Sequence, residues 1–79
     1  MTLYMIGKAN FAIKWYRHSN TLRLEKKESN REQLVSELTK LALDAADREL
    51  HEDFFEISDL LEDLEKGREP KLFELGITA

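Results

Sequence analysis

The chain has 79 residues, of which 42% are hydrophobic and 35% charged, and it contains no cysteine. A chain of this length buries only about 60% of the surface of its unfolded form, which limits it to one small core. We therefore expect a single domain over residues 1–79. Because there is no cysteine, disulfides and thiolate metal sites are excluded, and we expect a reducing compartment, the cytoplasm. We expect no membrane segment, because the apolar runs fall far short of about 20 residues, and no signal peptide, because the start is neither basic nor continuously apolar.

The formal net charge of -4 is unevenly distributed along the chain. Residues 1–31 hold seven basic and two acidic side chains, a net charge of +5, whereas residues 32–79 hold five basic and fourteen acidic ones, a net charge of -9. Such asymmetry indicates interaction surfaces of opposite sign. A core of this size rarely contributes more than about 3–5 kcal/mol of net stability, so we expect a second subunit to supplement it.

The basic part, residues 1–28, is rich in the residue types that favour β-strands, since most of its apolar side chains are aromatic or branched. Phe11, Ile13 and Trp15 fall on every second position, which would place them together on one face of a strand. The sequence therefore predicts strands in this part, with these three side chains in the core.

Residues 18–20 favour a hairpin turn, because Ser and Asn hydrogen-bond to their own backbone and Asn tolerates left-handed angles. A second turn at residues 7–10 would extend the hairpin to a three-stranded antiparallel meander. The alternative is a helix over the same residues, whose apolar stripe would hold Ala9, Ala12, Ile13 and Tyr16.

The acidic part, residues 29–79, is predicted to be helical. Ser29 and Glu32 have the spacing of a capping box, in which each side chain satisfies a free amide of the first turn, so a helix is expected to begin at Ser29. Between Ser29 and Lys66 the sequence contains neither Gly nor Pro. Two apolar stripes follow at helical spacing: Leu34, Leu38, Leu41 and Ala45, and then Leu50, Phe54, Ile57, Leu61 and Leu64.

The two stripes differ in phase. At about 100° per residue, the second stripe begins about 160° around the helix axis from the first. Either a turn within residues 46–53 folds a second helix back onto the core, with Asp47 or Asp53 as its cap, or one long helix buries its two halves against different subunits of an intertwined dimer. We favour the turn, because a monomer needs both stripes on one core.

The second helix is expected to end at Lys66-Gly67, where a cation precedes a helix-terminating glycine. Pro70 prevents continuation and would start a short helical piece over residues 70–75, ended by Gly76. Leu72, Phe73, Leu75 and Ile77 are apolar enough to dock on the core. The predicted fold class is therefore α+β, with a small antiparallel hairpin or meander packed on two C-terminal helices.

One cluster combines basic and aromatic side chains, as in proteins that neutralise phosphates and stack on bases. Its members are Lys14, Trp15, Tyr16, Arg17, Arg23, Lys26 and Lys27. The competing interpretation is structural: the apolar members belong to the core and the cations form the solvated face of a sheet. The acidic half of the chain also opposes nucleic-acid binding, because it repels phosphates.

The sequence predicts no catalytic residues, no metal site and no cofactor. Asp44, Asp47 and His51 would share a helix face, yet the chain has no HExxH motif, and a solvated surface is the simpler interpretation. No serine has an evident general base, and the three glycines are too far apart for a phosphate-binding loop.

The apolar side of the second helix points instead to a partner protein. Phe54 and Phe55 are adjacent, so about 100° separates them and both cannot lie at the centre of one narrow stripe. Either one of them anchors a partner, together with Asp59 and Asp63, or a broad core-facing stripe takes both rings without any partner. The leading hypothesis is a non-enzymatic interaction module, acting as a regulator, adaptor or inhibitor and forming a homodimer. The second is a regulator that binds nucleic acid through the basic hairpin.

Overall fold

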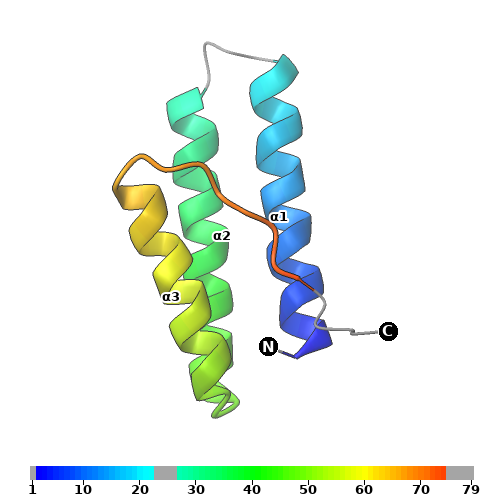
Figure 1. The fold of residues 1–79 in the computed structure, drawn as a ribbon, viewed down its shortest axis with the longest axis vertical. Helices are drawn as coiled ribbons and strands as arrows, with labels where there is room; N and C mark the ends of the chain where they lie inside the picture. The colour runs from blue at the N-terminus through cyan, green and yellow to red at the C-terminus, as the bar shows by residue number, and fades with distance from the viewer. Residues whose placement is uncertain (1, 23–26, 75–79) are drawn as a thin grey trace.

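The computed structural model describes residues 2–22 and 27–74, which form three antiparallel helices followed by an extended segment (Figure 1). The helices are α1 (Leu3–Leu22), α2 (Lys27–Asp47) and α3 (His51–Glu65). α2 packs against both other helices. Residues 66–74, which we call the C-terminal strap, leave the end of α3 and cross to α1 (Figure 1).

The predicted α+β fold is wrong, because the described residues contain no strand and the N-terminal part is the helix α1. The alternative, helical interpretation is the correct one: Ala9, Ile13 and Tyr16 are buried, with Met5 on the same face. Phe11 and Trp15, expected in the core as strand residues, are exposed instead. The predicted turn at residues 7–10 lies inside α1, as does the predicted hairpin turn at residues 18–20.

The first apolar stripe is confirmed, since Leu34, Leu38, Leu41 and Ala45 of α2 are all buried. They belong to one core cluster with the buried face of α1. In the second stripe Ile57 and Leu64 are buried, whereas Leu50, Phe54 and Leu61 are only partly buried against that cluster. The buried line of α3 is therefore Asp53, Ile57, Leu60 and Leu64.

The predicted turn between the two stripes is confirmed at residues 48–50. Glu49 adopts a left-handed conformation with φ 60°, and the amide of Leu50 donates to the carbonyl of Ala45 at 2.8 Å, which reverses the chain within three residues. Neither Asp47 nor Asp53 caps α3, because Leu50 occupies the cap position without a side-chain hydrogen bond.

The other predicted boundary signals had mixed outcomes. α2 begins at Lys27, so Ser29 lies within its first turn and does not mark the boundary. The helix end at Lys66-Gly67 is confirmed: Gly67 has φ 82° and its amide donates to the carbonyl of Leu64 at 3.1 Å. The short helix predicted from Pro70 is absent from residues 70–74, which are extended.

The strap is fixed to α1 by three hydrogen bonds to its backbone. The side-chain amide of Asn10 makes two hydrogen bonds to the backbone of Phe73: its Nδ2 donates to the Phe73 carbonyl at 2.9 Å, and its Oδ1 accepts from the Phe73 amide at 2.8 Å. The Arg17 guanidinium donates to the carbonyl of Pro70, whose ring is fully buried. Phe73 packs against the core as predicted and Leu72 is exposed; Leu75 and Ile77 lie outside the described residues. In the described ranges, residues 2–22 and 27–74, no helix is both long and apolar enough to cross a membrane.

Candidate functional site

The exposed side of α3 combines one aromatic ring with a row of carboxylates. Phe54 is partly buried against the core, whereas Phe55 is 64% exposed. The two rings meet edge to face, with centroids 5.8 Å apart and an interplanar angle of 71°. Of the two alternatives, the structure has the one in which the core takes only one ring; that the exposed ring anchors a partner stays a prediction.

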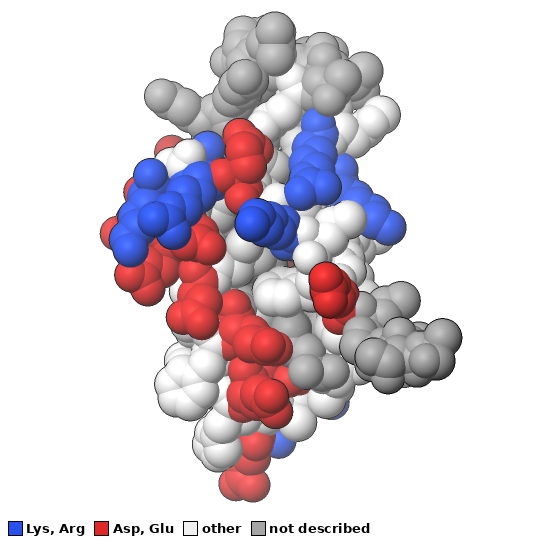
Figure 2. Space-filling model, in the orientation of Figure 1, with Lys and Arg blue, Asp and Glu red and all other residues white. Residues whose placement is uncertain are grey.

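Acidic side chains lie on one side of Phe55 on this surface. Because residues three, four and seven positions apart share a helix face, Phe55 lies beside Glu52, Asp59 and Glu62. Figure 2 shows acidic side chains along α3 and basic ones near its C-terminal end. There Lys66 pairs with Glu62 at 3.1 Å and Arg68 with Asp63 at 3.1 Å. We call Glu52, Phe55, Glu56, Asp59, Glu62 and Asp63 the acidic face of α3.

Three of the four residues predicted for a partner interface lie on this face: Phe55, Asp59 and Asp63. Asp59 is exposed, and Asp63 accepts a hydrogen bond from Arg68 across the helix end. Phe54 is a supporting residue, since its ring is directed toward the core. The residues of this face that sequence reasoning left out of the interface are Glu52, Glu56 and Glu62, although Glu52 and Glu62 lie at helical spacing from Phe55.

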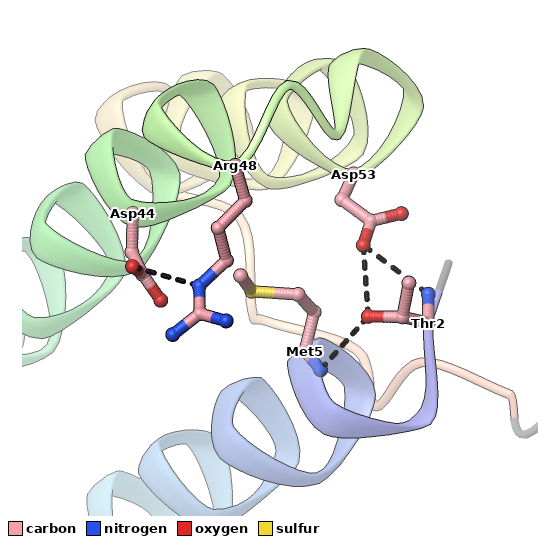
Figure 3. Close-up of polar contacts among 5 residues, drawn as sticks. All are labelled: Thr2, Met5, Asp44, Arg48 and Asp53. Atoms are coloured by element: carbon pink, nitrogen blue, oxygen red, sulfur yellow. Dashed lines mark hydrogen bonds and ion pairs between the residues drawn. The ribbon is translucent and has the colours of Figure 1, made fainter.

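Asp53, which the sequence suggested as a possible helix cap, is buried and connects α3 to the start of α1 (Figure 3). Its Oδ2 accepts hydrogen bonds from the backbone amide of Thr2 at 3.2 Å and from the Thr2 hydroxyl at 3.0 Å. The same hydroxyl oxygen accepts from the amide of Met5 at 3.3 Å, one of the free donors of the first turn. Its place on the line of Ile57, Leu60 and Leu64 could have revealed its burial from the sequence.

The predicted basic and aromatic cluster does not form one face. Lys14, Trp15, Tyr16 and Arg17 are consecutive in α1, so their side chains are distributed around the helix. Tyr16 is buried in the core, and Arg17 is bonded to the strap. Arg23 and Lys26 lie outside the described residues, and the side chain of Lys27 is likewise not described. Lys14 and Trp15 remain accessible, but they lie about 100° apart.

A second surface feature is a groove of about 730 Å³ between α1 and α2. Tyr4, Phe11 and Trp15 lie on its α1 side and are 48%, 76% and 36% exposed. Leu34, Leu38 and Leu41 of α2 also contribute to its lining. Sequence reasoning missed this aromatic stripe, although its members recur at intervals of seven and four residues, the spacing of one helix face.

Two cations flank the ring of Tyr4 at one end of the groove. The Nζ atom of Lys8 lies 5.2 Å from its centroid and the Cζ atom of Arg48 lies 5.0 Å from it. Arg48 also donates to the carboxylate of Asp44 at 3.0 Å, and this hydrogen bond raises the pKa of Arg48 above its ordinary value (Figure 3). The guanidinium thus contacts both the ring of Tyr4 in α1 and the carboxylate of Asp44 in α2.

In residues 2–22 and 27–74, no group of three or more His, Cys, Asp or Glu side chains is placed to hold a metal ion. The carboxylates of the acidic face lie in a row along one side of α3. Chemically, the acidic face of α3 offers a row of negative charges beside one exposed aromatic ring, Phe55. Comparison with protein families, with curated proteins and with solved structures finds no match for this chain.

Proposed function

We propose that this protein is a non-enzymatic interaction module that binds a basic surface of another protein through the acidic face of α3. The observation that carries the proposal is the ring of Phe55, which is 64% exposed, contacts Phe54 edge to face and is bordered on one side by carboxylates. Aromatic side chains are frequent hot spots of protein interfaces, and the surrounding polar residues exclude water from them.

Electrostatics supports a basic partner. Seven of the fifteen residues of α3 are Asp or Glu and none is Lys or Arg, so the potential along this helix is negative. Such a surface accelerates association with a positively charged partner, and the acceleration falls as salt screens the charges. The module would act as a regulator, adaptor or inhibitor by covering a basic surface that its partner otherwise uses, including a nucleic-acid-binding surface.

The test compares four forms of the protein as bait in an extract of its native host. We expect the wild type to retain a partner with a basic surface, Phe55→Ala to lose it by at least about tenfold, and Asp59→Lys to weaken it. Phe11→Ala is the matched control, because it removes a comparably exposed ring from a different helix. Equal retention by the wild type and Phe55→Ala would refute the proposal.

We also propose a cytoplasmic location. The support for it is the absence of cysteine from the chain, which fits a compartment where disulfides are not used for stability. Fractionation of host cells, with detection of the untagged protein by mass spectrometry, tests this. Recovery in a secreted or membrane fraction would contradict it.

A further inference from the structure

The strap contacts the bundle as a bound peptide contacts its receptor, through its backbone and two apolar side chains. Asn10 bonds to both the amide and the carbonyl of Phe73, and Arg17 donates to the carbonyl of Pro70. The ring of Pro70 is fully buried, and Phe73 packs against the core. The side chains between and after these two are exposed: Lys71, Leu72 and Glu74. In peptide recognition, backbone hydrogen bonds supply affinity and buried side chains supply specificity.

The spacing of the two α1 residues suits an extended segment. Asn10 and Arg17 are seven residues apart, which is about 10.5 Å along the axis of α1. The strap residues that they hold, Phe73 and Pro70, are three residues apart, and three extended residues span about 10 Å. Three helical residues rise only about 4.5 Å, less than half of this distance. The extended form of residues 70–73, where a helix was predicted, therefore matches the surface on which they lie.

This surface belongs to the helices and not to the strap itself. α1 and α3 both pack on α2 and little on each other, and the strap crosses from the end of α3 to α1 (Figure 1). Asn10 and Arg17 are residues of α1, and the cluster against which Phe73 packs draws on all three helices. We infer that the surface under the strap, which we call the strap site, binds an extended segment with Pro at one position and an aromatic residue three positions later. The strap is its resident ligand.

The contacts of the strap define the partner segment that the site fits. Asn10 and Arg17 bond to backbone groups that every peptide carries, so side-chain identity matters only at the two buried positions. The first position takes a Pro ring, whose nitrogen has no hydrogen to leave unpaired when it is buried. The fourth position needs a backbone N–H for Asn10, which excludes Pro, and takes an aromatic ring. An extended segment of another protein with this pattern replaces the strap.

The strap competes with any such segment, because it is tethered beside its own site. A short tether gives an effective concentration on the order of 1 mM. A strap that is docked in about nine of ten molecules then corresponds to a Kd of about 0.1 mM for the same segment without the tether. Competition from the strap weakens the binding of a free segment by about tenfold, so weakening the strap exposes the site. The proposed function does not enter this inference, because neither Asn10 nor Arg17 belongs to the acidic face of α3.

The test measures binding of a labelled, end-blocked peptide of residues 69–74 to the full chain by fluorescence anisotropy. The peptide has two carboxylates and one ammonium group, so the acidic face of α3 does not attract it. We expect Phe73→Ala, which weakens the resident strap, to bind the peptide with a Kd of about 0.1 mM, and the wild type to bind it about tenfold more weakly. Adding Asn10→Ala to Phe73→Ala should weaken binding again by at least about tenfold, because both hydrogen bonds to the Phe of the peptide are lost. Leu72→Ala, at an exposed strap position, is the matched control and should bind like the wild type.

A Phe73→Ala chain with unchanged helix content that does not bind up to about 1 mM peptide would overturn the inference, as would equal binding with and without Asn10. The wild type gives a second readout that needs no variant. Unlabelled peptide at about 10 mM should displace the strap of the ¹⁵N-labelled chain and speed hydrogen exchange at its Phe73 amide by at least about fivefold, with no change at Leu38. Unchanged exchange at Phe73 would also overturn the inference. Phe55→Ala should leave peptide binding as it is, so this inference and the proposed function fail independently.

Discussion

The contacts that α2 makes with α1 and α3 differ in kind from those that join α1 to α3 and to the strap. α2 meets α1 and α3 through apolar side chains, with Leu34, Leu38 and Ala45 fully buried between them. α1 is tied to α3 and to the strap by polar contacts, from Thr2 to Asp53 and from Asn10 and Arg17 to the strap backbone. Apolar burial is non-directional and supplies most of the stability, whereas hydrogen bonds add less free energy and fix position.

This contrast predicts that the largest loss of stability follows from opening the apolar contact around α2. Leu38→Ala removes a fully buried side chain at the centre of the bundle and leaves a cavity, which should lower the free energy of unfolding by about 2–5 kcal/mol. Urea denaturation followed by circular dichroism measures the change. Leu43→Ala, on the exposed side of the same helix, is the control and should change stability by less than about 0.5 kcal/mol.

A smaller loss is expected from the polar contact between α1 and α3. Asp53→Ala removes the acceptor of both Thr2 hydrogen bonds from a site only 3% exposed, and should lower the free energy of unfolding by about 1–3 kcal/mol. Asp59→Ala, further along the same helix on the acidic face, should stay within about 0.5 kcal/mol of the wild type. Equal effects of the two substitutions in urea denaturation would show that the buried position of Asp53 contributes nothing.

The smallest loss in the free energy of unfolding is expected at the strap, where amide exchange should nevertheless change clearly. Asn10→Ala should cost about 1–2 kcal/mol and release the amide of Phe73, which hydrogen exchange would detect as faster exchange at that residue. Asn10→Asp is the matched variant: it keeps the acceptor for the Phe73 amide and loses the donor to its carbonyl. Amide protection should therefore survive in Asn10→Asp and disappear in Asn10→Ala.

The candidate surfaces differ in how far the sequence could predict them. The acidic face of α3 follows from an amphipathic pattern in one helix, so the residue order alone is sufficient to propose Phe55, Asp59 and Asp63. The groove needs two helices, because its second wall comes from α2, and no property of α1 alone shows that Leu34 and Leu38 lie beside the aromatic stripe. Predicting it requires the packing of the bundle.

By itself, the sequence determined the features that depend on nearby residues. The helix end at Gly67 and the apolar stripe of α2 are local patterns of backbone preference and periodicity, and the change of phase between the two stripes required a turn in a monomer. Only the tertiary structure decided the form of residues 3–22. Their large apolar side chains lie all around the helix, with Phe11 and Trp15 exposed and Met5 and Ile13 buried, so hydrophobicity did not distinguish strand from helix. The choice was made by packing, because only a helix brings Met5, Ala9, Ile13 and Tyr16 together against the apolar face of α2.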